Sequence, residues 1–525
     1  MSTSNSSQDS RRHLIKSTSV LSLGTLTSRV LGFVRDLVLA QVLGTGVRAD
    51  AFFVAFKIPN MFRELVAEGA TNAAVVPVLS EVKAKKTTAE FWSCVNVLFF
   101  WGIVILSGVT LAGVVLSPGI VRLMAPGFLD DADKLDLTIR LTRMMFPYLL
   151  LIGLAAYGMG VLYTLRAFTL PAFSSALANA VLILCALWAW KQSTSTVFIL
   201  ALGVLAGGLA QVSLQFYALR KQGFRWEKPR NIFQPEAVRI KQLMIPRMFG
   251  SGVYQMSVLI DTFCASLAGI VGAGGIPAIY YAGRLVQLPM GLFGVSMAST
   301  ALPALSSQAG RADMPAFKKT LVFFLENIFF IMIPTTVIFL LTAQPVIRSL
   351  FERGAFDAYS TTITSSALMF YALGLTSFAA TKMLVTAFYA LQDTKTPVKV
   401  ATLCLILTVI LNFALMFPLK IGGIALANSI VSTLNCVILF ALIRKKINGL
   451  QQRLTPYVLK ICLASAIAGV FLYGAWMFVP IKIEIIKFFL LSGLTYLVYG
   501  AVCYGMKVEQ ARQTAGWIHK KFLPK

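Results

Sequence analysis

Charged side chains interrupt several of the long apolar segments of this sequence. They are Arg29, Arg35, Asp36, Lys57, Arg63, Glu64, Glu68, Asp261, Arg284 and Asp393. A charged side chain at the centre of a bilayer costs about 2.5–3.5 kcal/mol on insertion scales, so these groups should pair or line a hydrated cavity. Guanidinium groups stay charged when buried, and their planar fork binds two phosphate oxygens at once. Arginines that meet in one cavity would therefore suit a diphosphate.

Ion pairing without any ligand is the simpler explanation of these charges. Arg35 could pair with Asp36 or Glu68, and Lys57 could pair with Glu64. Lys57, Glu64 and Glu68 follow the spacing i, i+7 and i+11, which places them on about one face of a helix. Structural pairing is therefore credible for this part of the chain.

Arg284 argues against pairing as the full account. The segment around it, "IYYAGRLVQLPMG" (279–291), contains no acidic residue. A lone arginine in a membrane helix is a candidate functional group by default. We therefore favour an anion-binding site to which the arginines contribute.

Helix geometry sets a condition on such a site. Six residues of an ideal helix turn through about 600°, so Arg29 and Arg35 would point about 120° apart. Convergence on one ligand would need a bend, which Gly32 could permit. Pro59 and Asn60 could bend the next helix in the same way.

The composition indicates that an integral membrane protein positions these groups. Of the 525 residues, 57% are hydrophobic and 13% are charged, against about 45–50% and about 25% in soluble chains. The apolar runs are long and do not alternate, so they predict helices and not the strands of a barrel. The net charge of +26 lies mostly in short connections, which favours a role in topology over nucleic-acid binding.

The apolar runs predict an all-α protein with about fourteen transmembrane helices. They fall at 17–43, 51–80, 91–117, 138–164, 168–190, 196–219, 246–270, 276–306, 320–344, 362–391, 397–417, 422–443, 457–479 and 485–506. Alternate connections are rich in Lys and Arg, which predicts that both termini are cytoplasmic.

An internal repeat predicts two lobes. "AVVPVLSE" (74–81) matches "TALPALSS" (300–307), and "LYTLRAFTLPAF" (162–173) matches "FYALQDTKTPVK" (388–399). Pro303 follows Pro77 by 226 residues, and Pro397 follows Pro171 by the same offset. We expect two six-helix lobes related by a pseudo-two-fold axis along the membrane normal. The expected divisions are a basic tail (1–16), the lobes (17–230 and 231–450), an extra helix pair (451–507) and a second tail (508–525).

Other residue types offer little chemistry. The seven cysteines are scattered singly, and both histidines, His13 and His519, lie near the ends of the chain, so we expect no disulfide and no metal site. The stretch "DDAD" (130–133) could hold a metal in a membrane-embedded glycosyltransferase. We interpret it as a solvated outward loop, and we do not expect an enzyme.

Four segments are distinctive: "SRVLGFVRD" (28–36), "ADAFFVAFKIPNMFRELVAEGA" (49–70), "YYAGRLVQLPMGLFGV" (280–295) and "DTKTPVK" (393–399). They resemble the MviN/MurJ family, the bacterial lipid II flippases of the multidrug/oligosaccharidyl-lipid/polysaccharide exporter superfamily. The resemblance implies a bacterial inner-membrane protein that moves the undecaprenyl-diphosphate-linked peptidoglycan precursor between leaflets by alternating access. It also implies that the last helix pair, about 456–506, lines a groove for the lipid tail.

The resemblance assigns roles to individual residues. The family's cavity arginines match Arg29, Arg35, Arg63 and Arg284, its entrance aspartate matches Asp50 and its lysine matches Lys57; Asp36 completes the set of substrate-binding candidates. Sodium sites in some members suggest Asp261 and Asp393 as cation ligands. Gly283 and Gln287 stand where some relatives have acids, which puts a coupling role for those acids in doubt.

The expected partners are lipid II and membrane lipids, with peptidoglycan-synthesis proteins as further candidates and a monomer as the expected state. We expect no cofactor, and coupling to Na⁺ or to the membrane potential stays open. A cation-coupled exporter of drugs or of another polyprenyl-linked oligosaccharide is the alternative function.

Overall fold

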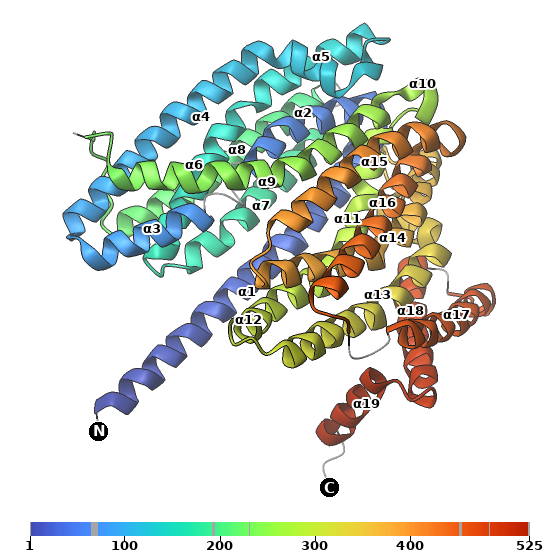
Figure 1. The fold of residues 1–525 in the computed structure, drawn as a ribbon. Coiled ribbons are helices and arrows are strands. Elements are labelled where there is room, and N and C mark those ends of the chain that lie inside the picture. Colours follow the sequence, from blue (N-terminus) through green and yellow to red (C-terminus); the bar gives the residue numbers. More distant parts are fainter. Residues whose placement is uncertain are drawn as a thin grey trace. The chain divides into compact units, whose positions relative to one another are not determined.

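Helices make up all the regular structure in the part of the chain that a computed structural model describes. The described residues are 2–64, 72–191, 195–229, 231–450, 454–481 and 483–522. Glu68, a candidate for pairing with Arg35, lies outside them. Within the described residues the chain forms two compact units, which we treat separately (Figure 1).

Unit 1 comprises Met1–Leu267 and the short segment Arg353–Phe356. Its helices are α1 (Ser2–Leu43), α2 (Val47–Arg63), α3 (Asn72–Lys85), α4 (Thr88–Met124), η2 (Pro126–Phe128), α5 (Ala132–Met145), α6 (Pro147–Thr164), α7 (Thr169–Ala189), α8 (Thr196–Lys221) and α9 (Pro235–Ser266). The segment 1–16, expected as a separate tail, continues the helix α1 from Ser2.

Unit 2 comprises Ala268–Glu352 and Asp357–Lys525. Its helices are α10 (Ala268–Val271), α11 (Gly275–Pro289), η3 (Met290–Val295), α12 (Ser296–Gly310), α13 (Met314–Phe351), α14 (Ala358–Ala390), α15 (Lys395–Leu419), α16 (Ile421–Lys446), α17 (Leu454–Phe478), α18 (Glu484–Gly505) and α19 (Glu509–Phe522).

Eleven helical segments of the described chain are long and apolar enough to cross a membrane. They coincide with eleven of the predicted runs and begin with Thr88–Met124 and end with Glu484–Gly505. The runs predicted at 17–43, 51–80 and 246–270 correspond to α1, to α2 with α3, and to α9. These helices carry most of the charged candidates.

Side-chain caps fix where several helices begin. Thr87 accepts a hydrogen bond from the Glu90 backbone N–H, and the Glu90 carboxylate accepts one from the Thr87 backbone N–H, which forms a capping box before α4. Asp313 caps α13 through the Ala316 N–H at 3.0 Å. These caps satisfy N–H groups that have no partner within their own helix.

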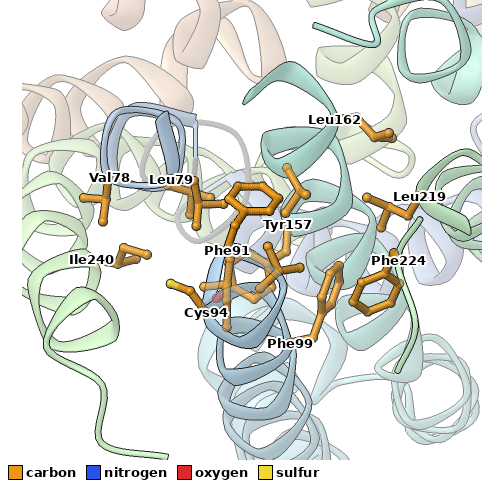
Figure 2. Close-up of a cluster of buried hydrophobic side chains, with 14 of the residues drawn as sticks. Val78, Leu79, Phe91, Cys94, Phe99, Tyr157, Leu162, Leu219, Phe224 and Ile240 are labelled. Atoms are coloured by element: carbon orange, nitrogen blue, oxygen red, sulfur yellow. The ribbon is translucent and has the colours of Figure 1, made fainter. Parts of the chain in front are cut away.

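The core of one part of unit 1 is a cluster of aliphatic and aromatic side chains. Figure 2 shows Phe91 and Phe99 of α4 close to Tyr157 of α6 and to Phe224, which follows α8. Phe99 and Phe224 lie with their ring centroids 5.5 Å apart. Ile240 of α9 belongs to the same cluster, so the hydrophobic packing already includes the first turns of α9.

α9 packs in unit 1, although the sequence-based lobe boundary lies at residues 230 and 231. Two ion pairs fasten its N-terminal end: Arg239 Nη1 lies 2.6 Å from Glu81 Oε2, and Lys86 Nζ lies 2.6 Å from Glu236 Oε1. A repeat boundary describes sequence similarity, whereas a packing boundary follows the contacts, so the two need not coincide. The relation of the two lobes by a two-fold axis stays a prediction.

The connection between α8 and α9 is bound along α4. Asn96, which is buried, donates its side-chain N–H to the Arg225 carbonyl at 3.2 Å and accepts from the Glu227 N–H at 3.1 Å. Trp101 Nε1 donates to the Ile232 carbonyl at 2.9 Å. The basic segment 220–242 is therefore held in place at several points.

Acid should loosen the N-terminal end of α9 from α3. The hydrogen bond from Lys85 and, as the next largest cause, the one from Arg239 lower the pKa of Glu81. The hydrogen bond from Lys86 lowers the pKa of Glu236. A carboxyl group whose pKa is lower in the folded than in the unfolded protein stabilises the fold at pH values above its unfolded-state pKa. This stabilisation is lost as the pH falls through the folded-state pKa. The distance between spin labels at the exposed positions 83 and 241 should be distributed more broadly at about pH 3 than at about pH 7.

A double variant provides the control for this pH prediction. Arg239→Gln combined with Lys86→Gln removes both ion pairs and should reproduce the broad distribution at neutral pH. An unchanged distribution in acid would mean that these pairs do not hold α9.

In unit 2, α18 docks on α13 at a proline. Pro334 has no N–H, so it cannot donate to the Phe330 carbonyl four residues earlier. The Tyr499 hydroxyl of α18 donates to that carbonyl at 2.9 Å, and the Tyr496 hydroxyl donates to the Ile331 carbonyl at 3.2 Å. The tyrosines thus satisfy backbone groups next to an interior proline while they join the two helices.

Candidate functional site

Arg35 is held between α1 and α7. Its Nε and Nη2 donate to Asp36 Oδ1 at 3.0 and 2.7 Å, and its Nη1 donates to Asn179 Oδ1 at 2.9 Å. The Asn179 side chain also donates to the Ser28 carbonyl at 3.2 Å. Asp36 is 2% exposed and Arg35 14% exposed, so the pair is largely removed from solvent. The predicted pairing of Arg35 with Asp36 is therefore confirmed, and Asn179 is a partner that the sequence did not indicate.

The prediction of a bend at Gly32 is not supported. α1 is a single unbroken helix from Ser2 to Leu43 (Figure 1). A Cβ atom at Gly32 would lie 3.5 Å from the Asn179 side-chain nitrogen, which is ordinary van der Waals contact, so the approach of Asn179 to α1 does not require a glycine here. Arg29 is exposed and makes no hydrogen bond or ion pair with the rest of the described chain. On a continuous helix, Arg29 and Arg35 point in different directions.

Lys57 of α2 contacts α9 within unit 1. Its Nζ donates to Thr262 Oγ1 at 2.6 Å, and the Thr262 hydroxyl donates to the Val258 carbonyl at 2.7 Å. The carboxylates of Asp261 and Glu64 are close enough to interact electrostatically with the Lys57 ammonium group. The predicted pairing with Glu64 is thus one of several interactions of this lysine.

A second set of contacts joins the C-terminal end of α2 to α9. Arg63 Nε donates to Asn60 Oδ1 at 2.7 Å, and Arg63 Nη2 lies 3.7 Å from Glu64 Oε1. Gln255, which is buried, donates to Glu64 Oε2 at 2.7 Å. α2 continues through Pro59 to Arg63, so the proline does not end the helix.

The sequence alone did not point to Gln255 and Thr262. A signal was present, because the two residues follow the spacing i, i+7 and therefore lie on one face of α9. Polar residues repeated on one face of an apolar helix indicate contact with other polar groups and not with lipid.

Asp50 forms a buried ion pair with Lys134 of α5. Lys134 Nζ lies 2.6 Å from Asp50 Oδ2 and 4.0 Å from the centre of the Phe128 ring. Asp50 is 3% exposed and Lys134 is 6% exposed. The carboxylates of 130–133 are exposed, as expected for a solvated stretch, whereas Lys134 directly after them is buried. Asp131 caps α5, which puts Lys134 in its first turn.

In unit 2, Arg284 of α11 contacts uncharged side chains. Its Nη2 donates to the Tyr280 hydroxyl at 2.9 Å, and its Nη1 donates to Gln287 Oε1 at 3.3 Å. The guanidinium carbon also lies 4.8 Å from the centre of the Tyr280 ring. Gln287 therefore serves as a hydrogen-bond acceptor for the arginine.

Asp393 has a structural role at the start of α15. It accepts hydrogen bonds from the Thr396 N–H at 3.0 Å and the Thr396 hydroxyl at 2.8 Å, and it forms an ion pair with Lys446. The hydrogen bond from Lys446 is the main cause that lowers the pKa of Asp393 to about 2. Cation binding at Asp261 and Asp393 stays a prediction.

Comparisons with known proteins point to one family. A family model described as lipid II flippase MurJ matches residues 39–494. A probable lipid II flippase MurJ of Buchnera aphidicola subsp. Acyrthosiphon pisum is 34% identical over 501 residues, which cover 92% of this chain and 96% of that protein. A lipid II flippase MurJ of Burkholderia cenocepacia is 34% identical over 435 residues, which cover 82% of this chain and 83% of that protein.

Solved structures agree with this result. A lipid II flippase MurJ in an inward closed conformation matches with a TM-score of 0.79 at 25% identity, over 93% of this chain and 99% of that chain. An inward-facing multidrug resistance MATE family transporter matches with a TM-score of 0.68 at 15% identity, over 82% of this chain and 98% of that chain. The second similarity concerns the fold alone.

Proposed function

This chain belongs to the MurJ family of lipid II flippases, and on that premise we propose that it moves lipid II from the inner to the outer leaflet of the bacterial cytoplasmic membrane. The observation that carries the proposal is the extent of the match, since relatives named for this activity align over most of both chains. The transport step moves the lipid without covalent chemistry, so the protein has to bind and release its substrate and change conformation.

We propose that arginines bind the diphosphate of the substrate. Arg29, Arg35 and Arg63 of unit 1 and Arg284 of unit 2 are the ligands expected from the family resemblance. Arg29 supports this role in a specific way, because its guanidinium group has no partner in the described chain and is exposed. Lys57, Asp36 and Asp50 would position these cations and balance their charge.

The membrane arrangement is part of the proposal. We infer about fourteen spans, two six-helix lobes, a C-terminal helix pair that binds the lipid tail, and cytoplasmic termini. The concentration of Lys and Arg in alternate connections supports this topology. The energy source is either a bound cation or the membrane potential, which acts with about 2.3 kcal/mol per charge per 100 mV. Asp261 and Asp393 are the candidate cation ligands; the Lys57 ammonium group lies close to Asp261, and Lys446 forms an ion pair with Asp393.

Arg29→Ala should reduce lipid II translocation by about tenfold or more, because a hydrogen bond to a charged group contributes about 1.5–3 kcal/mol. The change removes no contact within the described chain, so stability should be unaffected. Translocation would be measured with fluorescent lipid II in proteoliposomes, and growth would be scored in a strain depleted of its own flippase.

Arg122→Ala is the matched control, since Arg122 of α4 is also exposed and is not a candidate ligand. Normal transport by the Arg29 variant would remove this arginine from the binding site. Failure of the wild-type chain to move lipid II, combined with transport of another polyprenyl-linked oligosaccharide or a drug, would favour the exporter alternative.

A further inference from the structure

A carboxyl group in the apolar helix α13 has no role in the proposed transport of lipid II. Glu326 stands in the segment "VFFLENIFFIM" (322–332), inside a predicted span and far from the other charged candidates in the sequence. An ionisable residue within a membrane helix is costly unless it has a partner, so its contacts are informative.

Glu326 joins three helices of unit 2. Its Oε2 accepts a hydrogen bond from Gln510 Nε2 of α19 at 2.9 Å, and its backbone carbonyl accepts one from the Tyr457 hydroxyl of α17 at 3.0 Å. Gln510 is 6% exposed, and Val508 and Ala511 on either side of it belong to a buried cluster with residues of α17 and α18. The beginning of α19 is therefore docked against the helices that hold Glu326.

No cation neutralises Glu326 within the described residues. The basic side chains on α13 and on the elements near it form no ion pair with Glu326 within the described chain; they are Arg311, Lys318, Lys319, Arg348, Lys382, Lys460, Lys487, Lys507 and Arg512. Lys460 donates to the Met506 carbonyl. The other titratable groups near the site are the hydroxyls of Tyr457 and Tyr499 and the thiol of Cys503, and Glu509 next to Gln510 is exposed.

The amide of Gln510 is only half satisfied. Its Nε2 donates to Glu326, but its Oε1 is buried and accepts no hydrogen bond from any group that the structure describes. A carboxylate can only accept, whereas a protonated carboxyl group donates one hydrogen bond and accepts another. A proton on Glu326 would therefore supply the donor that Gln510 Oε1 lacks. Leaving this oxygen unpaired is unfavourable in a buried position.

We propose that Glu326 is a proton-binding site that controls the docking of α19. In the protonated state, the Glu326 O–H donates to Gln510 Oε1 while Gln510 Nε2 donates to the other carboxyl oxygen. Loss of the proton to water removes one of these two hydrogen bonds and leaves a carboxylate without a cation. The ionised state therefore favours release of the start of α19 from α13.

Hydrogen exchange of the peptide 508–516 tests this proposal in the full-length protein. After correction for the intrinsic rate, protection in the wild type should fall by about tenfold between about pH 5 and about pH 9, which corresponds to one buried hydrogen bond. Glu326→Gln mimics the neutral acid in size and cannot ionise, so its protection should not depend on pH. Glu509→Gln makes the same chemical change at an exposed neighbour and should behave as the wild type.

A second variant keeps the test decisive if Glu326→Gln folds poorly. Gln510→Leu keeps a buried side chain of similar size without the amide, so protection should be low and independent of pH. The proposal is overturned if wild-type protection does not change with pH, or if either Glu326→Gln or Gln510→Leu retains the wild-type pH dependence. None of these results depends on transport, so they are separate from the test of the flippase function.

Discussion

Lys134→Ala should destabilise unit 1 by about 3–5 kcal/mol, the usual effect of removing one partner of a buried ion pair. Lys134 Nζ lies 2.6 Å from Asp50 Oδ2, and both residues are almost completely buried. The variant removes the Lys134 ammonium group from contact with a buried carboxylate. Chemical unfolding of the purified protein in detergent would measure the change.

A double variant separates the ion pair from the packing around it. Asp50→Asn combined with Lys134→Met replaces the pair by groups of similar size without charge, and such replacements are often neutral or stabilising. The double variant should therefore recover most of the stability that Lys134→Ala loses. Lys85→Ala, which removes an exposed partner of Glu81, should change unfolding little. Equal effects of Lys134→Ala and Lys85→Ala would show that the buried pair does not stabilise the unit.

The ion pair between Asp50 and Lys134 could not be predicted from the sequence. Lys134 stands in an acidic stretch and is separated from Asp50 by 84 positions, so neither composition nor spacing connects the two. Their contact depends on the packing of α2 against α5. The cap at Asp131, by contrast, is a local feature that a sequence can reveal, because it concerns residues three positions apart.

The helices themselves were predictable because length and hydropathy determine them. Eleven predicted runs correspond to helices that could cross a membrane, and α1, α2 with α3, and α9 correspond to the remaining three. The boundary between the compact units was not predictable from the repeat. The reason is that α9 is fixed in unit 1 by specific contacts, such as the ion pairs of Glu81 and Lys86.

Within the candidate site, the interactions that the sequence indicated join residues at most seven positions apart, as in Lys57 and Glu64. Arg35 and Asp36 are adjacent, and their pairing follows from the sequence. Asn179 contacts Arg35 from a position 144 residues away, and Thr262 contacts Lys57 from a position 205 residues away. Glu326 was detectable as an acid in an apolar run, but its partner Gln510 lies 184 residues further along the chain.

Arg35→Lys should reduce lipid II translocation by about tenfold to a hundredfold while the protein stays folded. A lysine can keep the ion pair with Asp36, so the buried carboxylate retains a cation. It cannot donate to Asp36, to Asn179 and to a phosphate in the fixed directions that a guanidinium group offers. The proteoliposome assay would report transport, and chemical unfolding in detergent would report stability.

The variant Asn179→Leu tests whether Arg35 binds the substrate or mainly joins α1 to α7. It removes the contact between α7 and Arg35 but leaves the guanidinium group and its bonds to Asp36 in place. If Arg35 binds the substrate directly, this variant should lose stability but keep more transport activity than Arg35→Lys. If Arg35 mainly joins α1 to α7, Asn179→Leu should impair transport at least as strongly. That second pattern would remove Arg35 from the set of substrate ligands, because loss of the contact with Asn179 would then account for the effect of Arg35→Lys as well.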